Sequence, residues 1–124
     1  MSKILVIEDE KNILKSVAMY LEGHDYTVIL ADCGLNGIKE AEQNIPDLII
    51  LDLVLPDIDG YMVCKTLREH PKTSEIPILI MSAKSQKSDI DKAFKNGANE
   101  YIIKPFEPQV LIETVRQVMK EKVK

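Results

Sequence analysis

At 124 residues, with 45% hydrophobic and 29% charged residues, the chain has the length and composition of one globular domain with its own hydrophobic core. Its formal net charge of −4, without a basic face or arm, argues against direct nucleic-acid binding. The first apolar run, residues 4–7, is too short for a signal peptide or a membrane span, so we expect a cytoplasmic protein that contacts no membrane. We expect residues 1–124 to form a single domain.

Short apolar runs alternate with stretches of helical periodicity along the chain. The apolar runs predict strands at residues 4–7, 27–31, 48–51, 77–81 and 100–103. The periodic stretches predict helices at residues 11–22, 35–44 and 61–70, a fourth from Ser88 or Asp89 to Asn96, and a last one that begins near Pro108. This alternation predicts an α/β fold, an open and doubly wound parallel sheet with helices on both faces.

Apolar residues at helical spacing mark the face of each helix that we expect to be buried. In chain order these residues are Ile13, Leu14, Val17, Ala18 and Leu21; Ile38, Ala41 and Ile45; Val63, Cys64 and Leu67; Ile90, Ala93 and Phe94; and Val110, Leu111, Val115, Val118 and Met119.

Chemically distinctive side chains follow the predicted strands at their carboxyl ends. Glu8 and Asp9 follow the first strand, Asp52 the third, Ser82 the fourth and Lys104 the fifth. In a parallel sheet these ends share one edge, which is where open α/β sheets bind ligands. Clustered carboxylates repel one another and need a cation, and oxygen ligands together with a phosphate suit Mg²⁺.

The same residue set suits phosphoryl transfer to a carboxylate. A carboxylate can attack phosphorus and form an aspartyl phosphate. Such a reaction asks the protein mainly to position the groups and to neutralise charge on the phosphoryl oxygens. Mg²⁺ can neutralise one side, Lys104 another, and Ser82 can donate a hydrogen bond to a third oxygen.

Four motifs together resemble the receiver domain of two-component response regulators. They are ILVIEDE at residues 4–10, DLVLPDIDG at 52–60, MSA at 81–83 and GANEYIIKPF at 97–106. The resemblance covers essentially the whole chain and implies a flavodoxin-like fold with strand order 2-1-3-4-5. It implies that Asp52 is the phosphoacceptor, that Asp9 binds Mg²⁺ directly, and that Glu8 acts through a bound water. The backbone carbonyl of Val54 would complete the protein's share of the metal ligands.

The resemblance also assigns roles to residues around the phosphoacceptor. Ser82 and Tyr101 match the switch residues of the family, and Ala83 matches the small residue that admits the phosphoryl group. Lys104 matches the family's lysine, and its peptide bond to Pro105 is expected to be cis. Gly60, which ends the second motif, is expected to be structural.

These matches imply a phosphorylation-controlled switch rather than a conventional enzyme. A histidine kinase or histidine phosphotransfer protein would donate the phosphoryl group to Asp52, and the domain would catalyse its own phosphorylation and usually its hydrolysis. The new charge would draw Ser82 inward, and Tyr101 would fill the vacated space. This would repack a surface of the fourth helix, fifth strand and fifth helix, which binds a downstream protein.

Other functions remain open at this point. A phosphatase of the haloacid dehalogenase type needs a second Asp where this chain has Val54, and a flavodoxin-like electron carrier needs a phosphate loop where it has Glu8-Asp9-Glu10. A receiver that acts without phosphorylation commonly lacks an acid or the lysine. Thr114 stands where winged-helix regulators carry a dimerising arginine, which favours a single-domain protein that acts by protein contact. A receiver excised from a longer regulator also remains possible.

Overall fold

Five parallel strands form one sheet in the order β2-β1-β3-β4-β5 in the computed structural model, which describes residues 2–123. The strands are β1 (Lys3–Ile7), β2 (Thr27–Ala31), β3 (Leu48–Leu51), β4 (Ile78–Ser82) and β5 (Glu100–Ile103). They alternate with α1 (Lys11–Glu22), α2 (Gly34–Asn44), α3 (Gly60–Glu69), α4 (Lys87–Lys95) and α5 (Pro108–Val123). The predicted fold class and strand order are confirmed.

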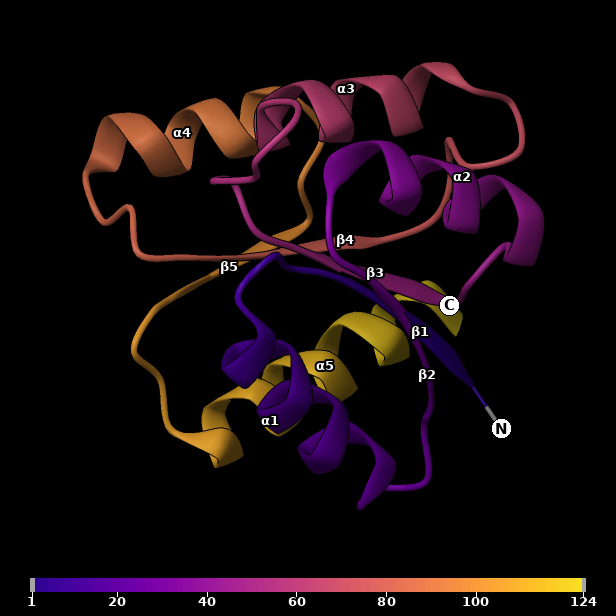
Figure 1. Ribbon diagram of the computed structural model, residues 1–124, viewed down its shortest axis with the longest axis vertical. Helices are drawn as coiled ribbons and strands as arrows, with labels where there is room; N and C mark the ends of the chain where they lie inside the picture. Colours follow the sequence, from indigo (N-terminus) through magenta and orange to yellow (C-terminus); the bar gives the residue numbers. More distant parts are fainter. Residues whose placement is uncertain (1, 124) are drawn as a thin grey trace.

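Helices cover both faces of the sheet (Figure 1). Helices α1 and α5 lie on one face, where Ile4 and Val6 of β1 belong to their hydrophobic cluster. Helices α2, α3 and α4 lie on the other, where Leu5 and Ile7 join a second cluster. Because side chains alternate along a strand, a strand covered on both faces must be apolar throughout. All four residues of β3 are accordingly fully buried.

Three residues predicted to be buried are exposed instead, and these predictions were wrong. Ile45 follows α2 as its C-cap in a left-handed conformation, with φ of 44°, and its side chain leaves the helix face. Phe94 on α4 and Val110 on α5 are 42% and 45% exposed. Both helices flank β5, the edge strand of the sheet, so they have no neighbour there to cover part of their apolar surface.

Helix α4 also begins earlier than predicted. Gln86, rather than Ser88 or Asp89, is its N-cap, and Asp89 completes a capping box by accepting the backbone N–H of Gln86. Such boxes satisfy N–H groups that the first turn of a helix leaves without partners. None of the helices within residues 2–123 combines the length and apolarity that a bilayer crossing requires.

The strand register places the distinctive side chains side by side. The last residues of β1 and β3 are paired, and so are those of β4 and β5. Glu8 and Asp52 therefore leave the sheet at the same level, and Lys104 follows the residue that pairs with Ser82. The parallel sheet thus gathers residues from four separate strands at one edge.

Candidate functional site

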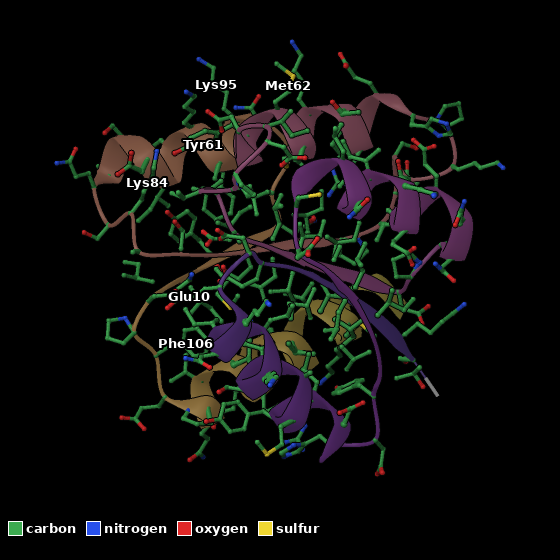
Figure 2. All side chains as sticks on the ribbon, viewed as in Figure 1. Glu10, Tyr61, Met62, Lys84, Lys95 and Phe106 are labelled. Carbon is green, nitrogen blue, oxygen red and sulfur yellow. The ribbon has the colours of Figure 1, made fainter. Side chains whose placement is uncertain are left out.

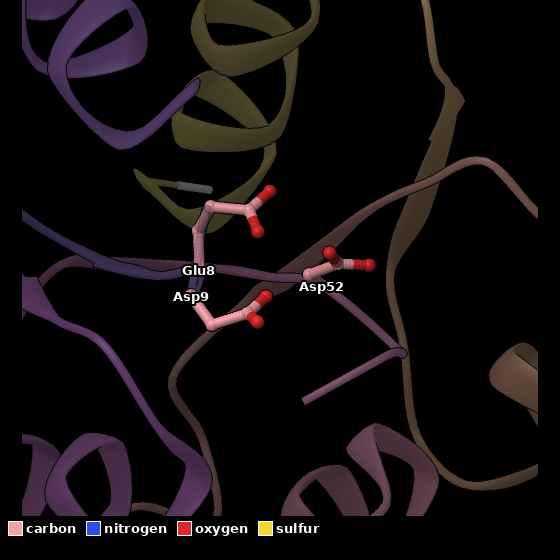
Figure 3. Close-up of side chains that lie close together, drawn as sticks. All are labelled: Glu8, Asp9 and Asp52. Carbon is pink, nitrogen blue, oxygen red and sulfur yellow. The ribbon is translucent and has the colours of Figure 1, made fainter. Parts of the chain in front are cut away.

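Three carboxylates meet at the carboxyl edge of the sheet (Figure 3). Glu8, Asp9 and Asp52 each offer an oxygen, and these oxygens all lie within 4.8 Å of one another. Glu8 is fully buried and Asp52 is 5% exposed, whereas Asp9 faces solvent. The sequence-based expectation that these acids converge is confirmed.

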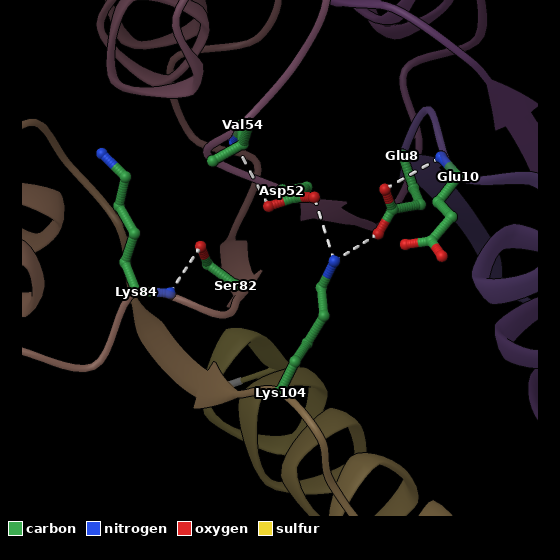
Figure 4. Close-up of polar contacts among 7 residues, drawn as sticks. All are labelled: Glu8, Glu10, Asp52, Val54, Ser82, Lys84 and Lys104. Atoms are coloured by element: carbon green, nitrogen blue, oxygen red, sulfur yellow. Dashed lines mark hydrogen bonds and ion pairs between the residues drawn. The ribbon is translucent and has the colours of Figure 1, made fainter.

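Lys104 connects two of the three acids (Figure 4). Its Nζ donates to Glu8 Oε1 at 2.7 Å and to Asp52 Oδ2 at 3.0 Å. The other oxygen of each acid accepts a backbone N–H, from Glu10 in the case of Glu8 and from Val54 in the case of Asp52. Backbone and ammonium donors therefore fix the orientation of both buried carboxylates.

The electrostatics of the cluster favour a further cation. Burial raises the pKa of Glu8 to about 7, and the hydrogen bond from Lys104 offsets only part of this effect. Burial acts to lower the pKa of Lys104, but its hydrogen bonds to Glu8 and Asp52 outweigh burial and raise that pKa. One ammonium faces three carboxylates, and an oxygen-rich donor set with excess negative charge is what Mg²⁺ binds. The residues present therefore fit the predicted metal.

The loop after β3 turns tightly behind Asp52. The backbone N–H of Gly60 donates to the Leu53 carbonyl at 3.0 Å, and a Cβ at Gly60 would lie 2.4 Å from Leu53 Cα. Asp59 accepts the N–H of Tyr61 at 2.8 Å and caps α3. Only glycine fits this close approach of backbone to backbone, which supports the structural role expected of Gly60.

Ser82 and Tyr101 meet through the loop that links β4 to α4. Ser82 is fully buried, and its Oγ accepts the N–H of Lys84 at 3.2 Å (Figure 4). The Tyr101 hydroxyl donates to the Lys84 carbonyl at 2.7 Å. Ala83, between Ser82 and Lys84, is exposed, and the peptide bond between Lys104 and Pro105 is cis, as expected. Both candidate switch residues therefore hold the same short segment.

Two features of the site surroundings could not be read from the sequence. The ammonium groups of Lys92 and Lys84 lie 4.3 and 5.3 Å from the centroid of the Tyr61 ring. The Lys84 side chain therefore points to Tyr61 of α3 rather than to the acids (Figure 2). Asp57, in the loop after β3, accepts the backbone N–H groups of Gly34 and Leu35. Both contacts join distant segments, and no local pattern marks them.

Known proteins resemble this chain both in sequence and in structure. Residues 4–116 match the response regulator receiver domain. The DNA-binding dual master transcriptional regulator RpaA of Synechocystis sp. is 39% identical over 120 residues, which cover 97% of this chain and 50% of RpaA. The chain thus spans about half the length of RpaA, as it does for several other curated relatives.

Solved structures share the fold over nearly the whole chain. The crystal structure of a putative response regulator from Chloroflexus aurantiacus has a TM-score of 0.91 and 36% identity, with 96% of this chain and 98% of that chain covered. The receiver domain of sensor histidine kinase PA1611 from Pseudomonas aeruginosa, solved with magnesium in its active site cleft, has a TM-score of 0.89 and 26% identity over 96% of this chain and 98% of that one. With its acidic cluster, lysine and 2-1-3-4-5 sheet, the chain belongs to the receiver domains of two-component response regulators.

Proposed function

We propose that Asp52 accepts a phosphoryl group and that the chain acts as a phosphorylation-controlled signalling switch. The observation that carries this proposal is the position of the Asp52 carboxylate. Asp52 lies buried at the end of β3, with Lys104 Nζ at 3.0 Å and with Glu8 and Asp9 in the same cluster. The donor is a histidine kinase or histidine phosphotransfer protein, the source of phosphoryl groups for this family.

The transfer needs one bond to form while another breaks. An Asp52 carboxylate oxygen attacks the phosphorus of a phosphohistidine, the P–N bond breaks, and its electron pair returns to the imidazole nitrogen. Negative charge spreads over the phosphoryl oxygens during this step. The Lys104 ammonium can neutralise part of that charge, and the Ser82 hydroxyl can donate a hydrogen bond. Receiver domains are not conventional enzymes, and we propose that this one catalyses its own phosphorylation and dephosphorylation.

The acidic cluster supplies the residues that would bind Mg²⁺. Asp9 and Asp52 would bind the ion directly, Glu8 through a bound water, and the backbone carbonyl of Val54 would complete the protein's share. When bound, Mg²⁺ supplies positive charge that neutralises the phosphoryl oxygens. The magnesium ion in the active site cleft of the PA1611 receiver supports this assignment.

The signal would leave through the α4, β5 and α5 surface. A charge on Asp52 would draw Ser82 away from the Lys84 N–H, and Tyr101 would then move inward from its bond to the Lys84 carbonyl. Phe94, Ile103 and Val110, which are at least 42% exposed, place apolar side chains on these three elements. Exposed apolar side chains favour a protein partner.

We also propose a wider role for the chain. RpaA is described as DNA-binding, and this chain covers half of it. We propose that residues 1–124 are the receiver unit of a cytoplasmic signalling pathway. Within it they contact a kinase or phosphotransfer protein and a downstream protein, and do not bind nucleic acid directly.

Phosphorylation of Asp52 can be tested with a small phosphodonor. Wild-type protein incubated with the donor and Mg²⁺ should gain one acid-stable, base-labile phosphoryl group, visible as a mass increase. Asp52→Asn, which keeps the shape of the side chain but lacks the nucleophile, should gain none, and chelation of Mg²⁺ should abolish labelling of the wild type. Asp25→Asn is a matched control, because Asp25 has a φ of 69° in an exposed turn that asparagine tolerates. Full labelling of Asp52→Asn, or none of the wild type, would contradict the proposal.

A further inference from the structure

Asp57 ties the loop after β3 to a helix of another part of the chain. Its Oδ1 accepts the N–H of Gly34 at 2.8 Å, and its Oδ2 accepts the N–H of Leu35 at 2.8 Å. Gly34 and Leu35 are the first two residues of α2. One carboxylate therefore accepts two hydrogen bonds from a segment 22 and 23 residues earlier in the sequence.

The first turn of α2 depends on this contact. Its own N-cap, Cys33, makes no capping hydrogen bond through its side chain. Free N–H groups and the helix dipole make a helix N-terminus favourable for a carboxylate. Backbone hydrogen bonds, that from Leu35 having the largest effect and that from Gly34 contributing as well, lower the pKa of Asp57 to about 2. Asp57 is thus ionised at neutral pH and caps α2 from outside the helix.

A second contact holds the same loop against α2. A Cβ at Gly34 would lie 2.5 Å from Ile58 Cγ1, so Ile58 packs directly against the glycine backbone. The two ends of the loop are fixed by β3 and by the Gly60 hydrogen bond to Leu53. Asp57 and Ile58 therefore fix its middle.

Val54 lies in this loop, three residues before Asp57. Its N–H donates to Asp52 Oδ1 at 3.2 Å, which ties the peptide bond between Leu53 and Val54 to the phosphoacceptor (Figure 4). The Val54 carbonyl belongs to the next peptide unit, which this bond does not fix. The Val54 side chain is 58% exposed and packs too little to hold the backbone in place. The orientation of its carbonyl then depends on how firmly the rest of the loop is anchored.

We propose that Asp57 is a positioning residue for the Mg²⁺ site, which it orders by holding the Val54 carbonyl in place through the contact with α2. This inference rests on the proposed function, because it takes the Val54 carbonyl as a metal ligand. Groups that orient metal ligands without touching the metal commonly affect affinity by about 10–100-fold. Loss of the anchor leaves Asp9 and Asp52 at the ends of the strands that position them, and weakens chiefly the contribution of the carbonyl.

The test compares Mg²⁺ binding by wild type, Asp57→Asn and Asp57→Ala, using calorimetry or amide NMR shifts with Mg²⁺ alone. We expect the dissociation constant to rise about tenfold in Asp57→Ala. The rise should be smaller in Asp57→Asn, which keeps one acceptor oxygen. Phosphorylation by a small donor should need correspondingly more Mg²⁺ for half-maximal rate but should reach the wild-type rate at saturating Mg²⁺. A general loss of structure would instead lower the maximal rate.

Asp47→Asn is the matched control. Asp47 also accepts a backbone N–H, from Lys3 at 2.8 Å, but it precedes β3 and lies at the end of that strand opposite Asp52. The Mg²⁺ affinity of the Asp47→Asn variant should equal that of the wild type. If Asp57→Ala does not fold, Asp57→Asn provides the comparison. Unchanged Mg²⁺ affinity in folded Asp57 variants, or an equal loss in Asp47→Asn, overturns the inference while the proposed function stands. Failure of the wild type to bind Mg²⁺ overturns both.

Discussion

At the scale of single residues, Lys104 provides the only ammonium that is hydrogen-bonded to the acidic cluster among the described side chains of residues 2–120. Its side chain is 14% exposed, and those of its partners Glu8 and Asp52 are 1% and 7% exposed. A buried carboxylate that loses its charged partner pays a desolvation cost with little in return. The acidic cluster therefore depends on Lys104 for its stability in the folded protein, besides the role that we propose for Lys104 in phosphoryl transfer.

Replacement of Lys104 by Met should make this dependence measurable. Without Mg²⁺ at pH 8, we expect Lys104→Met to lower the free energy of unfolding by about 1–3 kcal/mol. Glu8 already has its pKa raised to about 7 from 4.5, so its ionisation costs stability as pH rises through that range. Lys104→Met lacks the ammonium that partly offsets the burial of the Glu8 carboxylate. Its loss of unfolding free energy relative to the wild type should therefore be larger at pH 8, where Glu8 is ionised, than at pH 5. Urea denaturation at both pH values checks this expectation, and a deficit independent of pH would contradict it.

The convergence of the candidate site residues could be predicted because their positions follow from the order of the strands. Glu8, Asp52 and Lys104 each directly follow an apolar run, and parallel strands bring their carboxyl ends to one edge. The contact of Asp57 with Gly34 could not be predicted in this way. It depends on how two loops meet after the sheet has formed, and an aspartate in a loop carries no sign of which N–H groups it accepts.

At the scale of elements, Arg68 joins α3 to the segments that lead into β4 and β5. Its guanidinium donates to the carbonyls of Gly97, Ser74 and Ile76 and to Asn99 Oδ1. Gly97 has a φ of 109°, which favours glycine, and the Arg68 side chain packs against it. One side chain thus satisfies several backbone carbonyls at the end of the sheet opposite the acidic cluster.

We expect Arg68→Ala to destabilise the fold by about 2–4 kcal/mol, because it leaves several part-buried acceptors without donors. Arg68→Lys should recover little, since a lysine cannot match the planar array of donors. Lys65→Ala, on an exposed position of the same helix, should change stability by less than about 0.5 kcal/mol. Denaturant midpoints measure all three. A deficit in Arg68→Ala no larger than that of Lys65→Ala would show that water replaces these hydrogen bonds at no cost.

The elements themselves were predicted almost to the residue, but two of the helix faces were not. Helical periodicity shows that α4 and α5 each have an apolar face, and Ala93 and Leu111 are buried as expected. Periodicity does not show how wide that face is, which depends on the neighbours of the helix. At the β5 edge the sheet ends, so Phe94 and Val110 stay exposed. The two residues wrongly predicted to be buried on α4 and α5 therefore lie on the predicted partner surface.

At the scale of the whole molecule, the candidate site and the proposed partner surface are connected by one short path. Ser82 and Tyr101 hold the N–H and the carbonyl of the same residue, Lys84, and that residue immediately precedes the segment leading into α4. A movement of Ser82 toward a phosphoryl group therefore removes one of the two hydrogen bonds that hold the loop. Ser82 is the last residue of β4 and Tyr101 lies within β5, and these two strands are paired. The side chains can therefore move without a rearrangement of the sheet.

This path predicts that Tyr101 responds to phosphorylation only when Ser82 has its hydroxyl. The chain has four tyrosines and no tryptophan, so isotopically labelled tyrosine gives a simple NMR spectrum. In wild type, phosphorylation with Mg²⁺ should move the Tyr101 signal in proportion to the phosphorylated fraction. In Ser82→Ala the phosphoryl group can still reach Asp52, but nothing draws the loop inward, so the Tyr101 signal should stay in place. Tyr26, on the α1 and α5 side of the sheet, serves as internal reference. A full Tyr101 shift in phosphorylated Ser82→Ala would show that the charge acts on the partner surface by a route that does not need the serine hydroxyl.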